Sequence, residues 1–155
     1  MLISKMKKEG PLKFEYNKIT NYIYIGTNQC CQIGFNKKLI KEKIKADVSL
    51  EAELIDSPYG IEYYLWIPVK DTHSPTQKQL EIGVNFIANL VKDKIKVFVH
   101  CQRGHGRSPT LVAAYLISKG KSVDEAIEII KKKRPAIHPN KFQMNALKKF
   151  EEKQK

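Results

Sequence analysis

Hydrophobic positions along the chain alternate between the period of strands and the period of helices. Short β-branched or aromatic runs predict strands, and apolar residues three or four positions apart predict helices. The strand candidates are Ile19–Gly26, Ala46–Leu50, Ile61–Val69 and Lys96–Val99. The helix candidates begin near Asn36, Thr76, Ser108, Ser122 and Pro139. Because strands alternate with helices, the pattern indicates a three-layer α/β domain with a short, mostly parallel central sheet flanked by helices.

Capping and breaking residues mark the ends of several predicted elements. The segment Ser122–Glu125 matches a capping box, and Pro135 is expected to end the helix that follows it. Asn36 is expected to cap a short helix whose apolar face would carry Leu39, Ile40 and Ile44. Residues 1–13 are polar and are expected to be frayed or loosely attached.

The composition fits one soluble domain that spans residues 1–155, with 42% hydrophobic and 28% charged residues. No apolar run approaches the roughly 18 residues of a membrane span, and the N-terminus lacks the apolar stretch of a secretion signal, so we expect a cytoplasmic protein. The net charge of +12 has two explanations. The first is a lysine-rich solvated surface, and the second is attraction to polyanions such as RNA or anionic lipid. The even spread of lysines favours the first.

The spacing of the cysteines indicates neither a disulfide nor a metal site. Cys30 and Cys31 are neighbours, which we interpret as a poor arrangement for a mutual bridge, and the third cysteine is Cys101. The spacing of a cysteine metal site is absent, so we predict reduced thiols in a reducing compartment. Cys30 and Cys31 are expected to be inert, since nothing in the sequence places either of them beside Cys101.

The most informative segment runs from Val97 to Ser108 and reads VFVHCQRGHGRS. Cys101 ends a buried strand and precedes a helix, so it faces unpaired N–H groups and a partial positive charge. Gly104 and Gly106 allow backbone N–H groups to turn inward, and Arg107 adds a planar, fixed cation. Thiols in such surroundings have pKa values of roughly 3.5–7.5 instead of about 8.5. Cys101 is therefore expected to be largely ionised at neutral pH.

The same loop is suited to a tetrahedral oxyanion. Backbone N–H groups would hold its oxygens and Arg107 would grip two of them, which places a phosphorus atom in front of the sulfur. In-line attack by the thiolate follows from that arrangement. Ser108 is positioned to bond the sulfur and help the thiolate leave. It could also be only the N-cap of its helix, and the two roles are compatible.

A proton donor for the leaving oxygen is expected upstream of this loop. Asp71 follows the strand that ends at Val69, and the carboxyl ends of neighbouring parallel strands meet at one edge of a sheet. We therefore predict that Asp71 is the general acid. The alternative is an aspartate that only stabilises its own turn.

These residues resemble the signature of the protein tyrosine phosphatase superfamily, in particular the small atypical dual-specificity phosphatases. The likeness covers most of residues 19–150 in the order typical of that family. Its motifs here are Tyr22–Gly26, Ile67–Asp71, His100-Cys101-x5-Arg107-Ser108, Gly104-x-Gly106-Arg107-Ser108-x-Thr110 and Arg134-Pro135-x2-His138-Pro139-Asn140-x2-Gln143.

The resemblance implies a two-step phosphatase that needs no metal or other cofactor. Cys101 would be the nucleophile, Arg107 the phosphate ligand and Asp71 the acid and then the base, while His100 would help to lower the thiol pKa. Asn140 is a supporting residue that we interpret mainly as a helix cap. The phosphate-binding residues would be Gln102, Arg103, Gly104, His105, Gly106 and Arg107.

Three functions remain open from the sequence. The first is a phosphatase for phosphotyrosine, and also phosphoserine and phosphothreonine, in phosphoprotein partners. The second is a phosphatase for phospholipid head groups or RNA 5′-triphosphate ends, suggested by the net charge and by the basic Arg103 and His105, each of which is otherwise a solvated loop residue. The third is a phosphate-binding module without activity, which the presence of Cys101, Arg107 and Asp71 disfavours.

Overall fold

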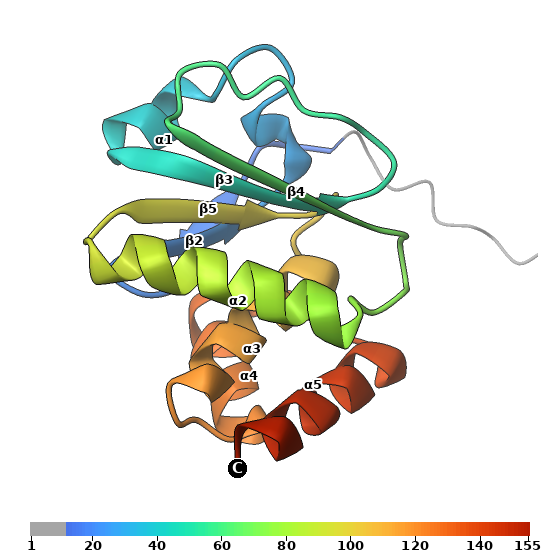
Figure 1. The fold of residues 1–155 in the computed structure, drawn as a ribbon. Coiled ribbons are helices and arrows are strands. Elements are labelled where there is room, and N and C mark those ends of the chain that lie inside the picture. Colours follow the sequence, from blue (N-terminus) through green and yellow to red (C-terminus); the bar gives the residue numbers. More distant parts are fainter. Residues whose placement is uncertain (1–11) are drawn as a thin grey trace, which may run out of the picture.

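A computed structural model describes residues 12–155 and confirms the predicted α/β architecture (Figure 1). Within these residues the sheet has five strands, in the order β1-β2-β5-β3-β4. β1 pairs with β2 in antiparallel fashion, and the other neighbours are parallel. The strands are β1 (Tyr16–Lys18), β2 (Ile23–Gly26), β3 (Ile44–Glu51), β4 (Tyr63–Val69) and β5 (Lys96–His100).

Helices cover both faces of the sheet. Figure 1 shows α2 to α5 below the sheet and the short helices η1 and α1 above it, so the domain has three layers. No helix within residues 12–155 is long and apolar enough to cross a membrane. The helices are η1 (Asn28–Cys30, a 3-10 helix), α1 (Lys37–Lys41), α2 (Gln77–Lys92), α3 (Arg107–Ser118), α4 (Val123–Lys133) and α5 (Lys141–Gln154).

Helix capping follows the predicted pattern. The predicted capping box of Ser122 and Glu125 is present at α4, and similar boxes start α2 at Thr76 and α5 at Asn140. The prediction for Asn36 is right, since its side chain accepts from the Lys38 amide, but α1 is shorter than expected. Lys43 adopts a left-handed φ of 63°, which ends the helix, so Ile44 lies in β3 instead of on the helix face.

The N-terminal prediction can be compared only in part. Residues 1–11, which make up most of the segment expected to be frayed, lie outside the described residues. Lys13 is described, and its carbonyl accepts a hydrogen bond from Thr27 Oγ1 at 3.2 Å. The strand expected from Ile19 is shorter, because Thr20 Oγ1 accepts from the amides of Tyr22 and Ile23 and makes a turn between β1 and β2.

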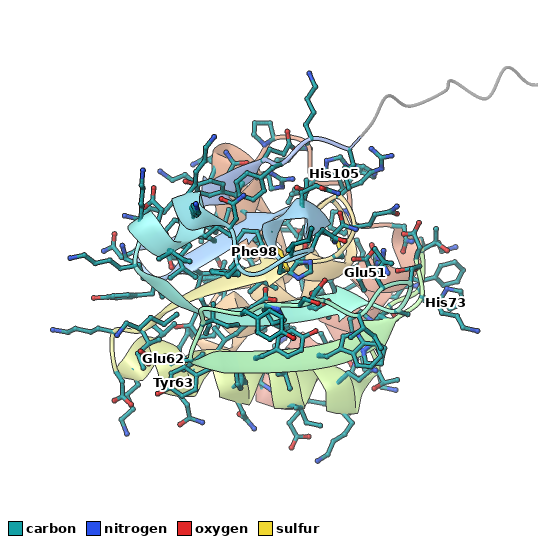
Figure 2. All side chains as sticks on the ribbon, turned by 90° about the horizontal axis from the view of Figure 1, so that it is seen from above. Glu51, Glu62, Tyr63, His73, Phe98 and His105 are labelled. Carbon is teal, nitrogen blue, oxygen red and sulfur yellow. A yellow bond between two sulfur atoms is a disulfide. The ribbon has the colours of Figure 1, made fainter. Side chains whose placement is uncertain are left out.

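Two separate cores lie on opposite faces of the sheet. The large core, under α2 to α5, takes Val97 and Val99 from β5, whereas Phe98 points into the small core under η1 and α1. Figure 2 looks onto the small-core side, with Phe98 inside the outline of the molecule. In the same view Glu62 and Tyr63, at the start of β4, lie at the opposite end from His73. The strand ends near His73 carry the candidate site.

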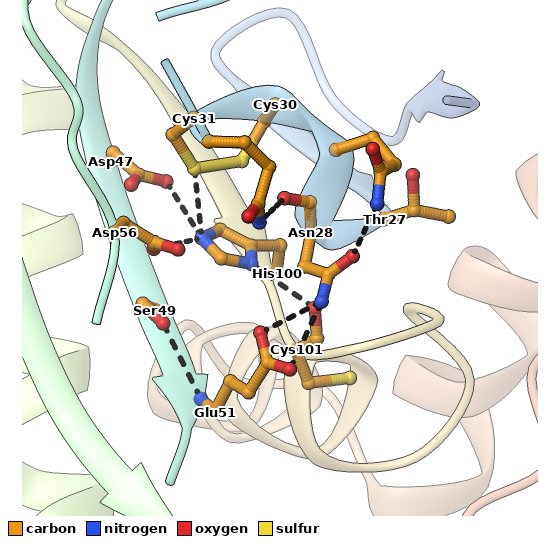
Figure 3. Close-up of a disulfide and its surroundings, with 12 residues drawn as sticks. Thr27, Asn28, Cys30, Cys31, Asp47, Ser49, Glu51, Asp56, His100 and Cys101 are labelled. Carbon is orange, nitrogen blue, oxygen red and sulfur yellow. Dashed lines mark hydrogen bonds and ion pairs between the residues drawn. A yellow bond between two sulfur atoms is a disulfide. The ribbon is translucent and has the colours of Figure 1, made fainter. Parts of the chain in front are cut away.

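Cys30 and Cys31, predicted to be separate reduced thiols, form a disulfide in the small core (Figure 3). The prediction was wrong because it took adjacent cysteines as unable to meet. Cys31 ends η1 with φ −152° and ψ 35°, a turned backbone that directs both buried side chains toward the interior. In an extended strand the two side chains would point to opposite faces.

Candidate active site

The loop between β5 and α3 encloses the N-terminus of α3. Gly104 uses a left-handed φ of +70°, and a Cβ there would lie 2.6 Å from the Gly26 carbonyl oxygen. Gly106, the N-cap residue of α3, has φ −127°, so it does not adopt the left-handed conformation that only glycine reaches easily. A Cβ at Gly106 would instead meet Gln143 Oε1 at 3.0 Å. Both glycines therefore allow close packing around the loop, and only Gly104 needs the left-handed region.

Cys101 lies at the base of the loop with 3% of its surface exposed. Its sulfur lies 3.3 Å from Ser108 Oγ, so Ser108 contacts the sulfur and does not act as the N-cap. Burial is the largest influence on this thiol and raises its pKa. The Ser108 hydroxyl and amide, the Arg107 charge and the Gly104 amide outweigh it, so the pKa of Cys101 lies below its ordinary value. The structure thus supports the predicted thiolate.

Arg107 is buried, and a carboxylate that the sequence interpretation missed holds it. Nη1 donates to Glu53 Oε2 at 2.8 Å and to the Val69 carbonyl at 2.7 Å. Both acceptors bind Nη1, and Nη2 faces Asp71 Oδ1 at 3.6 Å. Glu53 also accepts the Asp71 amide at 2.9 Å, so one carboxylate links the arginine to the Asp71 loop.

The Glu53 carboxylate remains ionised in this position. Partial burial raises the pKa of Glu53. The hydrogen bonds from Arg107 and from backbone amides lower it by more than burial raises it, so the pKa lies below its ordinary value. A charged acceptor on a buried guanidinium gives a strong, directional bond. The signal in the sequence is an acidic residue three positions after the predicted strand Ala46–Leu50, which is too common to identify Glu53.

Asp71 lies at the mouth of the loop with its carboxylate 65% exposed. Oδ1 accepts the Thr72 amide at 2.9 Å, the local bond expected of a turn aspartate. Two residues at the start of α5 hold the segment after it. Asn140, the N-cap, donates from Nδ2 to the Thr72 carbonyl at 2.7 Å, and Gln143 donates from Nε2 to the His73 carbonyl at 3.1 Å. Asn140 is thus the predicted helix cap and also a support for the Asp71 loop.

These segments enclose a pocket of about 340 Å³. It contains most of the predicted site residues and adds Thr72, His138 and Gln143. Ser108, Gly104 and His100 do not line it: Ser108 contacts the sulfur, Gly104 packs against Gly26, and His100 bonds the Cys101 carbonyl. The lining residues are Asp71, Thr72, Cys101, Gln102, Arg103, His105, Gly106, Arg107, His138, Asn140 and Gln143.

Arg134 is a second supporting residue whose role the sequence interpretation missed. Its buried guanidinium donates to the Gly104 carbonyl at 2.9 Å and to the Arg103 carbonyl at 2.7 Å. The same side chain binds Asn17 Oδ1 and Glu15 Oε1 near β1. Arg134 therefore fixes the outer side of the loop to the edge of the sheet.

His105 contributes less charge than expected. Burial, together with the charge of Arg134, keeps the pKa of His105 below its ordinary value, which favours the neutral ring. Its ring centroid lies 5.0 Å from that of His138, and its carbonyl accepts the His138 amide at 2.8 Å. The predicted excess of positive charge in the loop, assigned to Arg103 and His105, therefore rests mainly on Arg103.

His100 does not line the pocket, and in Figure 3 its ring lies beside Asp47, Asp56 and Cys31. Its Nδ1 lies 3.1 Å from the Cys101 carbonyl oxygen, which ties the ring to the loop backbone. Burial alone would disfavour the imidazolium, but Asp47 and Asp56 outweigh it and raise the pKa of His100 well above its ordinary value. Asn28, also in the small layer, donates from its backbone to the Gln102 carbonyl and from its side chain to Glu51.

Comparisons with known proteins agree with this geometry. The family described as dual specificity phosphatase, catalytic domain, matches residues 23–153. Rat dual specificity protein phosphatase 5 is 37% identical over 91 residues, which are 57% of this chain and 24% of the rat protein. Protein 123R of Invertebrate iridescent virus 6 is 32% identical over 146 residues, 88% of this chain and 92% of the viral protein.

A solved structure shows the same arrangement of elements. The crystal structure of PTPMT1 in complex with PI(5)P has a TM-score of 0.76 and 28% sequence identity, and the alignment covers 90% of this chain and 96% of that one. The chain spans about a quarter of the length of rat dual specificity protein phosphatase 5. The viral protein and PTPMT1, in contrast, are matched over nearly their whole length.

Proposed function

The chain belongs to the dual specificity phosphatase catalytic-domain family, and from this premise we propose that it is a cysteine-dependent phosphatase of phosphoproteins. It would hydrolyse phosphotyrosine and also phosphoserine and phosphothreonine. The observation that carries the proposal is the arrangement in one pocket of the Cys101 sulfur, the Arg107 guanidinium and the exposed Asp71 carboxylate. A single cytoplasmic domain remains part of the proposal and rests on composition.

In the first step the phosphate binds to the N–H groups of the loop and to Arg107. Glu53 and the Val69 carbonyl hold Nη1, which leaves other N–H groups of the guanidinium for the phosphate oxygens. The Cys101 thiolate attacks phosphorus in line with the leaving oxygen. A sulfur–phosphorus bond forms and the phosphorus–oxygen bond breaks, while protonated Asp71 gives its proton to the leaving oxygen.

In the second step water attacks the cysteinyl phosphate. The Asp71 carboxylate takes a proton from the water, and the sulfur–phosphorus electron pair returns to Cys101 as a thiolate. Ser108 Oγ, 3.3 Å from the sulfur, donates to the departing thiolate. Inorganic phosphate leaves, and the enzyme regains its first state with Asp71 protonated.

We propose a permissive site, because the walls of the pocket are short connections. One wall is the turn after Asp71, and the other is the start of α5 with His138. An open pocket admits the short side chains of phosphoserine and phosphothreonine as well as phosphotyrosine. Peptides that differ only in the phosphorylated residue test this, and turnover of phosphotyrosine alone would contradict a permissive site.

The mechanism is tested by hydrolysis of a small aryl phosphate. We expect Cys101→Ser to lose turnover down to background, and Asp71→Asn to lose roughly 10²- to 10⁴-fold in kcat. Asp93→Asn, which changes an exposed aspartate at the end of α2, should keep the activity. Rapid quenching of the wild type should trap phosphate on Cys101. Full activity of Cys101→Ser would contradict the mechanism.

An alternative substrate class has some support. The net charge is +12, Arg103 lines the pocket, and PTPMT1 was crystallised with PI(5)P. We therefore include phosphoinositides and RNA with a 5′-triphosphate beside the phosphopeptides in one assay. A higher kcat/KM for phosphopeptides supports the main proposal, and a preference for either of the other substrates would replace it.

A further inference from the structure

A compact group of metal-ligating side chains lies in the small core behind the loop. Cys30, Cys31, Asp47 and His100 each offer one ligand atom, and these atoms all lie within 4.8 Å of one another. All four residues are buried, and none lines the substrate pocket. Figure 3 shows that they come from the end of η1, from β3 and from β5, with Asp56 beside them. We call these four residues the small-core cluster.

The hydrogen bonds available in the disulfide form do not satisfy this cluster. His100 Nδ1 bonds the Cys101 carbonyl, so only Nε2 faces the cluster. That nitrogen has three neighbours: Asp56 Oδ2 at 2.9 Å, Asp47 Oδ1 at 3.4 Å and Cys31 Sγ at 3.5 Å. It carries at most one proton and can donate to only one of them.

The two carboxylates share a single ion-pair partner among the described residues, the His100 ring. Both side chains are fully buried, and among residues 12–155 none of the four carboxylate oxygens of Asp47 and Asp56 receives a hydrogen bond of acceptable geometry. Buried carboxylates without hydrogen bonds are costly and rare. Two such groups share one ring nitrogen, which leaves room for a metal cation that both sulfur and oxygen can bind.

The donor set and its spacing fit zinc. Thiolate sulfur, imidazole nitrogen and carboxylate oxygen are the three kinds of ligand that zinc accepts in proteins, and four such donors make a four-coordinate site. Bond lengths of about 2.0–2.3 Å place tetrahedral donors roughly 3.3–3.8 Å apart. The contacts of His100 Nε2 with Asp47 Oδ1 at 3.4 Å and with Cys31 Sγ at 3.5 Å fall in that range. The Nδ1 contact with a backbone carbonyl is the usual outer contact of a zinc-bound histidine.

We propose that the reduced chain binds one Zn²⁺ through Cys30, Cys31, Asp47 and His100, with Asp56 as an outer carboxylate. The disulfide in the structure and the zinc site are then two exclusive states of the same cysteines. A dithiol reductant supplies two electrons, so that the sulfur–sulfur bond breaks and two thiols form while the reductant becomes a cyclic disulfide. Zinc then replaces both thiol protons and any proton on His100 Nε2, and these protons go to water.

The proposed metal is structural. It would hold His100, and through the Cys101 carbonyl it would hold the backbone of the loop, on the side opposite the substrate pocket. The inference is independent of the proposed function, because it holds whether or not the chain turns over a phosphate ester.

The test uses the full chain, reduced with a dithiol, freed of reductant without air, and titrated with Co²⁺ or Zn²⁺. We expect one metal per chain by elemental analysis, with the thiolate-to-cobalt charge-transfer band and the intense visible bands of a tetrahedral cobalt site. The oxidised wild type should bind no metal at this site. Because the two forms share one sequence, this comparison does not depend on whether a variant folds.

Variants locate the site. Cys30→Ser/Cys31→Ser should lose the charge-transfer band, whereas Cys101→Ser removes the third thiol and should keep both the band and the stoichiometry. Asp56→Asn should keep one metal per chain but weaken its binding roughly 10- to 100-fold. The proposal is overturned if the reduced wild type shows no charge-transfer band, or if the double cysteine variant binds metal as the wild type does.

Discussion

The two faces of the central sheet are both buried, but they bury different chemistry. The face under α2 to α5 presents only apolar side chains from the three central strands, such as Ile23, Val48 and Val99. The face under η1 and α1 combines Tyr24 and Phe98 with buried polar groups. These polar groups are Asp47, Ser49, Glu51 and His100.

The difference separates stability from the positioning of the site. Apolar burial contributes roughly 25 cal/mol per Å² and is insensitive to direction, so the large core stabilises the domain without specifying loop geometry. Hydrogen bonds are directional, and the polar face lies directly behind the loop that carries Cys101. Changes to the large core should therefore lower stability, and changes around the loop should lower activity.

The largest expected effect lies in the large core. Ile87 is fully buried on α2, and Ile87→Ala should lower the free energy of unfolding by about 2–5 kcal/mol. Ile82→Ala, on the same helix but 46% exposed, should cost much less. Denaturant unfolding measures both. Under conditions where both variants are folded, kcat should equal that of the wild type; a parallel loss of kcat would break the comparison.

The next largest effect is expected at Gly104, compared with Gly120, since both glycines have a left-handed φ. Gly104→Ala should cost about 1–3 kcal/mol from backbone strain and should also lower kcat, because its Cβ would press on the Gly26 carbonyl. Gly120, with φ +97°, has no described atom within 4 Å of such a Cβ. Gly120→Ala should therefore cost stability alone, as unfolding and turnover assays would show. Equal effects on kcat would contradict the role of close packing at Gly104.

A smaller effect is expected at Glu53. Glu53→Gln keeps the size of the side chain but weakens its hold on Arg107 Nη1, and kcat/KM should fall roughly 10- to 100-fold. Glu62→Gln, which removes an exposed ion pair with Lys45, should leave kcat/KM unchanged. Steady-state kinetics at one pH separates them. If Glu53→Gln has the kcat/KM of the wild type, the Val69 carbonyl alone orients the Arg107 guanidinium.

The smallest change concerns the pKa of Cys101. Its pKa is lowered, so alkylation by iodoacetamide should reach its plateau at a lower pH than for free cysteine. Ser108→Ala removes a donor to the thiolate and should move the alkylation curve to higher pH. Ser118, at the far end of α3, donates from its hydroxyl to the Tyr115 carbonyl, and Ser118→Ala serves as the control. If the alkylation curves of Ser108→Ala and Ser118→Ala coincide, Ser108 is excluded as a partner of the thiolate.

Local patterns explain why so much of the fold was predictable. Alternation in β5, the capping boxes of α4 and α5 and the glycine-rich loop each depend on residues close in sequence. Hydrophobic period and capping chemistry act over a few residues, so they can be identified without tertiary contacts. The same local signals indicated Cys101, Arg107 and Ser108, which lie within one loop and the first turn of one helix.

The supporting residues could not be found in this way. Arg134 binds the Gly104 carbonyl from 30 positions away, and Glu53 binds Arg107 across 54 positions. Their bonds exist only after the strand order β2-β5-β3-β4 has brought the strand ends together. Any buried arginine or exposed acid would have looked the same in the sequence.

By itself, the sequence determined the α/β class, the helix ends and the order nucleophile, arginine, serine within one loop, because these follow from short-range geometry. Only the tertiary structure decided that Cys30 and Cys31 meet, that they lie against His100, and that Asp47 and Asp56 converge on the same nitrogen. These contacts join a short helix, two parallel strands and a loop. The physical reason is that the burial of a polar group is set by everything that surrounds it, and no local pattern records those surroundings.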